Sequence, residues 1–119
     1  MGLSVGIITF NEEKRLERTL ESVKSFADEV IIVDSGSTDK THEIAQKFSA
    51  NFFVESWKGY GLQKNSVIDK CKEDWILLID ADEVISPELK NKIIEIVNQS
   101  KDDVYEINFT SVCFGKKIK

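Results

Sequence analysis

Residues 75–83 have the sequence Trp-Ile-Leu-Leu-Ile-Asp-Ala-Asp-Glu, in which five apolar residues lead directly into an acidic cluster. The apolar run is too short for an ordinary helix and predicts a strand that is buried on both faces. Asp80 and Asp82 follow at its carboxyl end, and on an extended backbone they point to the same side. Carboxylates ionise at a high free-energy cost beside a dry core, so we expect a positive group nearby. A divalent cation is the natural candidate.

The rest of the chain alternates between strand and helix patterns. Ser86 and Pro87 provide a strong helix start, a capping serine followed by proline at the first helical position. We expect strands at 3–10, 29–34, 51–55, 75–79 and 103–109, and helices at 13–24, 40–48, 62–71 and from 87 onward. This order predicts an α/β fold, a Rossmann-like three-layer sandwich whose mostly parallel sheet carries helices on both faces. We expect residues 1–119 to form a single domain.

Composition excludes several classes of function. With 41% hydrophobic and 31% charged residues, the chain is typical of a globular protein. Its 16 basic and 21 acidic residues give a net charge of −5, which argues against a nucleic-acid partner because that requires a basic face. Cys71 and Cys113 form no CxxC pair and no zinc-ligand spacing with the single histidine. The sequence has neither a signal-peptide pattern nor a bilayer-spanning apolar segment, and we expect a cytoplasmic protein.

Polar residues follow three of the expected strands at the point where each strand ends. In open parallel sheets, ligands bind at the carboxyl ends of the strands, near the point where the strand order reverses. We therefore expect these side chains to form one site, although Asn11 also suits the cap of the first helix. They are Asn11 and Glu12 after the first strand, Asp34 and Ser35 after the second, and Asp80 and Asp82 after the fourth.

The segment Asp80-Ala81-Asp82 has two interpretations. Taken alone, it fits a solvated acidic turn before the helix that begins at Pro87. Directly after a buried strand, it fits a site in which one carboxylate binds a metal ion and the other accepts a hydrogen bond from a sugar hydroxyl. The position after the strand favours the second interpretation.

Two further segments lie at the same predicted edge. In residues 33–41, Asp34 is placed to read a base or a ribose, whereas residues 37–39 suit a turn and a helix cap. In residues 57–65, two glycines permit close backbone approach, and Lys64 near a helix start could meet a diphosphate. The same segment fits a flexible loop with a surface lysine. Trp57 and Tyr60 suit pocket lining and loop anchoring equally well.

Four motifs together resemble the family 2 glycosyltransferases of the GT-A fold, and most of all the bacterial lipopolysaccharide-core glucosyltransferases. Their order and spacing extend the resemblance over residues 3 to about 100. It implies inverting transfer of a sugar from a nucleotide-diphosphate donor, most often UDP-linked, to a glycan or lipid-linked acceptor. The motifs are Ile8-Thr9-Phe10-Asn11-Glu12-Glu13, Val33-Asp34-Ser35-Gly36-Ser37-Thr38-Asp39, Gln63-Lys64-Asn65 and Leu78-Ile79-Asp80-Ala81-Asp82-Glu83.

The resemblance also implies roles for individual residues. Residues 9–12 would flank the base and the ribose, and Asp34 would hold the uracil. Lys64 would approach the base or the phosphates, Asp80 would contact the ribose, and Asp82 would hold Mn²⁺ or Mg²⁺ against the diphosphate. The full donor-binding set is Thr9, Phe10, Asn11, Glu12, Asp34, Ser35, Gly61, Lys64, Asp80, Ala81 and Asp82.

Members of this family normally continue beyond 119 residues. Their later part supplies the acceptor surface and the general base, which we therefore expect beyond Lys119. We expect this chain to be the donor-binding part, truncated before the acceptor-binding part, with its own turnover left open. If the protein acts on a lipid-linked acceptor, we expect it at the inner face of the membrane. An incomplete sheet would expose an edge, which favours self-association.

Three other functions stay open. A haloacid-dehalogenase-type phosphatase also has DxD after a buried strand, but on its first strand, and it would leave Asn11 and Asp34 unexplained. A nucleotidyltransferase would need a glycine-rich, basic loop after the first strand, and that loop is missing here. The non-enzymatic alternative is a module that binds a nucleotide sugar without transferring it.

Overall fold

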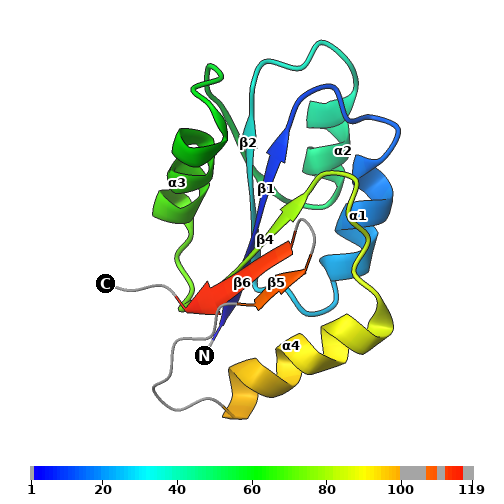
Figure 1. Cartoon of the computed structure of the whole chain (residues 1–119). Coiled ribbons are helices and arrows are strands. Elements are labelled where there is room, and N and C mark those ends of the chain that lie inside the picture. Colours follow the sequence, from blue (N-terminus) through cyan, green and yellow to red (C-terminus); the bar gives the residue numbers. More distant parts are fainter. Residues whose placement is uncertain (1, 100–106, 110–111, 117–119) are drawn as a thin grey trace.

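The computed structural model of the chain describes residues 2–99, 107–109 and 112–116. Strands and helices alternate from the first strand to the fourth helix, and two short strands follow (Figure 1). In chain order the elements are β1 (Leu3–Thr9), α1 (Leu16–Val23), β2 (Glu29–Asp34), α2 (Thr41–Lys47), β3 (Asn51–Val54), α3 (Tyr60–Lys70), β4 (Trp75–Asp80), α4 (Pro87–Gln99), β5 (Ile107–Phe109) and β6 (Val112–Lys116).

The strands form one sheet in the order β3-β2-β1-β4-β6-β5. The first four are parallel, whereas β6 runs antiparallel to β4 and β5 antiparallel to β6. From β1 the chain proceeds outward through β2 and β3, and then crosses back to place β4 on the other side of β1. The strand order therefore reverses between β1 and β4, where a ligand crevice is expected. Ile8 pairs with Asp80 and Thr9 with Asp34, so the three strands end at the same level.

Helices cover both faces of the sheet (Figure 1). On one face, α1, α2 and α4 pack in a core that includes Leu16, Ala45 and Ile93. On the other face, α3 packs through Val67, and Cys71 directly after the helix joins the same cluster. The predicted three-layer α/β arrangement with a mostly parallel sheet is confirmed. None of the helices in the described ranges combines the length and the apolar composition needed to cross a membrane.

The C-terminal part of the sheet was not predicted in full. The fifth strand was expected at 103–109, of which 107–109 form β5, while residues 103–106 lie outside the described residues. The sequence analysis missed β6 altogether. Its place is decided by β4, whose open side pairs with it, and by Phe114, which is 1% exposed and stacks on Trp75 with ring centroids 5.1 Å apart. Self-association through the outer strands β3 and β5 stays a prediction.

Candidate functional site

A cavity of about 620 Å³ opens at the carboxyl ends of β1, β2 and β4, at the point where the strand order reverses. Its volume lies in the range of small-molecule sites, roughly 300–1,000 Å³. Seven of the eleven predicted donor-binding residues line it, and they come from three separate loops. The lining residues are Ile8, Thr9, Phe10, Glu12, Ser35, Trp57, Tyr60, Asp80, Ala81 and Asp82.

One wall of the cavity is acidic. Glu12, Asp80 and Asp82 contribute carboxylates to it. Burial raises the pKa of Glu12, and the negative charges of Asp82, Asp39 and Asp80 raise it further, against the opposing effect of Arg15. The Arg15 guanidinium lies 3.5 Å from the Glu12 carboxylate. Because three carboxylates share this wall, it attracts a cation and repels an isolated anion.

The turn after β4 presents its two aspartates outward. Asp80 and Asp82 are exposed, whereas Ala81 between them is only 2% exposed, which is the alternation expected from the sequence. The backbone amide of Glu83 donates to the carbonyl of Asp80 at 3.0 Å and closes the turn. Within the described residues, no hydrogen bond or ion pair holds the carboxylate of Asp80 or Asp82. Both are therefore available as oxygen ligands.

Asp34 does not line the cavity. The residue is 1% exposed, and its two carboxylate oxygens accept four hydrogen bonds. The hydroxyls of Thr9 and Ser37 donate to Oδ1, and the amides of Gly36 and Ser37 donate to Oδ2. The direct contact of Asp34 with the uracil stays a prediction. In the structure four protein donors occupy this carboxylate, which holds the loop after β2.

Ser35, the next residue, does line the cavity. Its Oγ is buried, and within the described part of the chain it has no hydrogen-bond partner. Buried polar groups are nearly always paired, so an unpaired hydroxyl at a cavity wall calls for a partner that the cavity would supply. Of the two adjacent residues that the sequence analysis placed in the donor-binding set, Ser35 is thus the one that lines the cavity.

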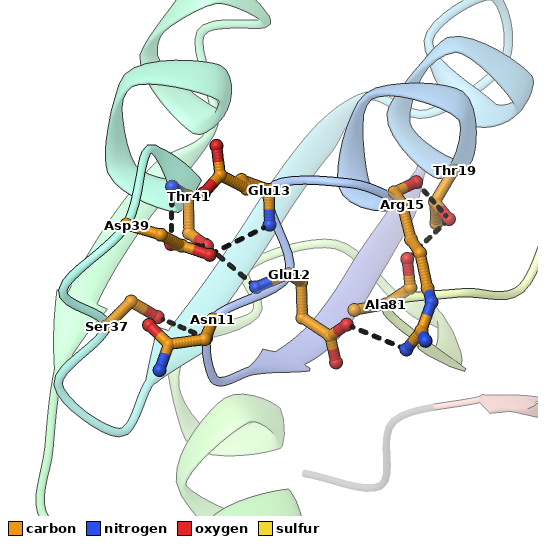
Figure 2. Close-up of polar contacts among 9 residues, drawn as sticks. All are labelled: Asn11, Glu12, Glu13, Arg15, Thr19, Ser37, Asp39, Thr41 and Ala81. Atoms are coloured by element: carbon orange, nitrogen blue, oxygen red, sulfur yellow. Dashed lines mark hydrogen bonds and ion pairs between the residues drawn. The ribbon is translucent and has the colours of Figure 1, made fainter.

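Asn11 joins the loops after β1 and β2 (Figure 2). Its backbone amide donates to Ser37 Oγ at 2.7 Å, and its side-chain Oδ1 accepts from the Thr38 backbone amide at 2.8 Å. It has a positive φ of 51°, which asparagine tolerates better than most residues. The prediction that Asn11 caps the first helix was wrong: α1 begins at Leu16 after a turn, its N-cap is Arg15, and no side chain caps it. Asn11 also does not line the cavity.

Asp39 and Thr41 complete this junction between the two loops (Figure 2). Thr41 Oγ1 accepts from the Glu12 amide at 2.9 Å, and Asp39 Oδ2 accepts from the Glu13 amide at 3.1 Å. Burial raises the pKa of Asp39, but hydrogen bonds from Thr41 and Glu13 outweigh this effect and hold the pKa below its ordinary value. The expectation that Asp39 is mainly structural agrees with these contacts, which fix the backbone that presents Glu12 to the cavity.

Trp57 and Tyr60 form the aromatic side of the cavity. Their rings meet edge to face with centroids 4.9 Å apart, and the residues are 50% and 68% exposed. Of the two interpretations that the sequence left open, the structure favours pocket lining. Between them, Gly59 has a φ of +98°, a conformation that side-chain-bearing residues rarely adopt, and it turns the chain into α3.

Gln63 anchors the loop between β3 and α3, which carries Trp57 and leads into Tyr60 and is called the aromatic loop below. The sequence analysis assigned no role to Gln63. It is fully buried, its Oε1 accepts from the Lys58 amide at 3.3 Å, and its Nε2 donates to the Glu55 carbonyl at 3.4 Å. The Glu55 carboxylate pairs with Lys70 at 2.6 Å and with Lys58 at 2.9 Å. A polar residue on the sheet-facing side of a predicted helix was the available signal, because such a residue must find buried partners.

Gly61 and Lys64 do not line the main cavity. Both are exposed on α3. Lys64 lines a separate space of about 10 Å³ together with Ile8 and Asp80. Among the described residues, no group of three or more His, Cys, Asp or Glu side chains is placed to hold a metal ion by itself.

Comparison with known proteins identifies the family. The model of the family described as Glycosyl transferase family 2 matches residues 4–114. A Rickettsia bellii protein named as an uncharacterized glycosyltransferase is 50% identical over 103 residues, which cover 87% of this chain and 35% of that protein. The lipopolysaccharide core biosynthesis glycosyltransferase LpsC of Rhizobium meliloti is 37% identical over 107 residues, covering 86% of this chain and 39% of LpsC. The chain thus spans between a third and two-fifths of the length of these relatives.

Solved structures agree with this assignment. S. aureus TarS is similar with a TM-score of 0.68 and 26% identity, covering 87% of this chain and 21% of TarS. Glucosyl-3-phosphoglycerate synthase from Mycobacterium tuberculosis, in complex with Mn²⁺, UDP and glucosyl-3-phosphoglycerate, has a TM-score of 0.67 over 82% of this chain and 40% of the synthase, with 22% identity. This second likeness concerns the fold alone. The match of the family model over residues 4–114 and the similarity to the curated relatives show that the chain belongs to glycosyl transferase family 2.

Proposed function

We propose that the cavity binds a nucleotide-diphosphate sugar, with a UDP-sugar as the first choice, together with a divalent cation. The chain would be the donor-binding part of an inverting glycosyltransferase that acts on a glycan or lipopolysaccharide acceptor at the inner face of the membrane. The observation that carries this proposal is the cavity at the strand-order reversal, whose lining combines Asp80 and Asp82 with an aromatic pair, Trp57 and Tyr60. The similarity to LpsC supports the choice of acceptor.

Different parts of the proposed donor would contact lining residues of different chemistry. The aromatic pair offers apolar faces for the flat base or the sugar ring, and the unpaired hydroxyl of Ser35 offers a hydrogen bond to a polar edge. Asp80 would accept hydrogen bonds from the ribose hydroxyls. Asp82 would lie nearest the cation and the diphosphate. Lys64 would act only if the diphosphate extended toward the neighbouring small space.

The carboxylate oxygens that line the cavity fit Mn²⁺ or Mg²⁺ as ligands. These ions prefer oxygen ligands, and Mg²⁺ is commonly held by one or two carboxylates together with the phosphates of a substrate. Asp82, with Asp80 and Glu12 on the same wall, matches that pattern better than a cage made of protein alone. When bound, the cation would neutralise the charge that develops on the diphosphate. The fold of the M. tuberculosis synthase, in complex with Mn²⁺ and UDP, accommodates this pair of ligands.

The proposed reaction is a displacement at the anomeric carbon of the sugar. An acceptor hydroxyl oxygen forms a bond to that carbon while the bond to the diphosphate oxygen breaks, so the electron pair leaves with the nucleotide diphosphate. The hydroxyl proton passes to a general base, and we assign no residue of this chain to that role. What this chain contributes is the orientation of the donor, by the aromatic loop on one side and by Asp80 and Asp82 on the other.

Calorimetric titration with UDP tests the proposal. The chain should bind UDP in the presence of Mn²⁺, and binding should weaken by at least about tenfold without the metal or in Asp82→Ala. Asp69→Ala is the matched control, because Asp69 is exposed on α3 and does not line the cavity. That variant should bind like the unchanged chain.

Other outcomes would favour other functions. A folded sample that binds no UDP with or without Mn²⁺ would refute the proposed site. Phosphatase activity that depends on Asp80, or a phosphoaspartyl adduct there, would favour the dehalogenase-type reaction. If a longer chain that includes the acceptor-binding part also bound a UDP-sugar without hydrolysing or transferring it, that result would favour a binding module.

A further inference from the structure

We propose that Thr19 and Ser22, two hydroxyl residues of α1, are positioning residues for the acidic turn after β4. They would fix the backbone on which Asp80 and Asp82 are presented to the cation and the nucleotide. This inference rests on the proposed function for its ligand, but its hydrogen bonds are those of the chain alone. Neither residue lines the cavity, so neither is expected to touch the donor.

Thr19 reaches from α1 to the centre of the turn (Figure 2). Its Oγ1 donates to the carbonyl oxygen of Ala81 at 2.6 Å, and the residue is fully buried. A threonine inside a helix ordinarily bonds to a carbonyl one turn back in its own helix. That alternative acceptor is Arg15, whose carbonyl is 3.4 Å away. A hydroxyl has one proton, and the shorter contact indicates that Thr19 uses it on the turn.

Ser22 holds the other end of the same segment. Its Oγ accepts from the Ile85 amide at 3.0 Å and donates to the Thr19 carbonyl at 2.7 Å. The second bond fixes the side-chain rotamer that the first bond needs. The two hydroxyls therefore bracket the turn, at Ala81 and at Ile85, whose side chains are 2% and 5% exposed in the same core as α1.

The turn needs such support because its functional side chains have none. Asp80 and Asp82 are exposed, and no hydrogen bond or ion pair holds either carboxylate within the described ranges. Their direction is therefore decided by the backbone, and the backbone between them is the peptide that Thr19 binds. Groups that orient a metal-binding carboxylate from behind commonly change metal affinity by about 10–100-fold when they are removed.

The variants are Thr19→Val, which replaces the hydroxyl with a methyl group, and Ser22→Ala. Thr19→Ser keeps the hydroxyl and should restore the behaviour of the unchanged chain. Ser4→Ala is the control for loss of a buried hydroxyl: Ser4 is fully buried, but it bonds to Glu29, which pairs with it near the amino ends of β1 and β2, away from the turn.

Two measurements separate positioning from simple stabilisation. Amide hydrogen exchange of Ile85, measured without ligand, should accelerate by about tenfold in Ser22→Ala and stay unchanged in Ser4→Ala. Calorimetry should show that the gain in UDP affinity from Mn²⁺ falls by about tenfold in Thr19→Val and Ser22→Ala, but not in Ser4→Ala or Thr19→Ser.

If Mn²⁺ increased the UDP affinity of Thr19→Val and Ser22→Ala as much as that of the wild-type chain, the inference would be overturned, even if both variants were less stable. An unchanged exchange rate of Ile85 in Ser22→Ala would overturn it as well. If the unchanged chain bound no UDP at all, the proposed function would fail by itself. The Ile85 exchange rate would then still decide whether Ser22 holds the turn.

Discussion

Replacement of Asp34 should reduce stability, whereas replacement of its neighbour Ser35 should reduce ligand affinity. Asp34 is 1% exposed and accepts four hydrogen bonds, two from hydroxyls at Oδ1 and two from backbone amides at Oδ2. In Asp34→Asn the remaining oxygen can face the two amides, which can only donate. The new NH₂ group then faces the hydroxyls of Thr9 and Ser37, which can rotate to accept.

The magnitudes follow from this count of donors. Hydrogen bonds to a charged group contribute about 1.5–3 kcal/mol each, roughly twice as much as neutral ones. Because Asp34→Asn keeps an acceptor for both backbone amides but loses the charge and the acceptor of the two hydroxyls, we expect it to lower the free energy of unfolding by about 1–2 kcal/mol. Asp34→Ala leaves the amides of Gly36 and Ser37 without their acceptor, and we expect a loss of about 3 kcal/mol or more.

Urea denaturation followed by tryptophan fluorescence measures these losses. Asp69→Asn, on the exposed side of α3, should stay within about 0.5 kcal/mol of the unchanged chain. Ser35→Ala removes a buried hydroxyl that has no partner within the described residues, so stability should be unchanged or slightly higher while UDP affinity falls. The reasoning is refuted if Asp34→Asn unfolds like the control but binds UDP more weakly, because Asp34 would then act as a ligand contact.

Three further predictions concern the surroundings of the site. Hydrogen bonds from Lys70, Ser66 and Lys58 lower the pKa of Glu55 from 4.5 to about 2, so its carboxylate stabilises the fold above pH 4.5, and this contribution is lost as the pH falls toward 2. The urea midpoint of Glu55→Gln should therefore depend less on pH across that window, and an unchanged pH profile would contradict the assignment. Gln63→Leu should lower the free energy of unfolding by about 1–3 kcal/mol and accelerate amide exchange at Lys58, because both hydrogen bonds to the aromatic loop are lost; slow exchange in that variant would show that other contacts hold the loop. Gly6→Ala should destabilise by about 1–3 kcal/mol in the same urea assay, because its new Cβ would lie 2.4 Å from a Val67 methyl carbon under α3, and a neutral result would mean that α3 moves easily.

The sequence predicted the sheet and the edge at which the site lies. Apolar runs such as residues 75–79 identify buried strands without tertiary information, and the alternation with helices then determines where polar residues gather. The antiparallel strand β6 escaped prediction because its short segment, Val112–Lys116, becomes a strand through pairing with the open side of β4. Its identity as a strand depends on a partner distant in the sequence.

The distribution of roles within the site could not be predicted for a different reason. Asp34 and Ser35 are adjacent, and both are polar residues at a strand end, but one is saturated by four protein donors while the other faces the cavity. Asn11 likewise suits a helix cap by its residue type, yet it joins two loops because α1 begins several residues later. In each case hydrogen-bond partners from another loop decide the role, and sequence spacing does not record them.

Hydrogen-bond saturation therefore separates residues that build the site from residues that are free to act in it. Asp34 and Asp39 have their acceptors occupied by the loops they hold, whereas no hydrogen bond or ion pair occupies the carboxylates of Asp80 and Asp82 within the described residues. Free carboxylates on one wall oppose an anionic ligand, and Glu12 adds to that opposition. A cation between this wall and a diphosphate would offset that repulsion. The charges of the site thus support the divalent cation in the proposed function.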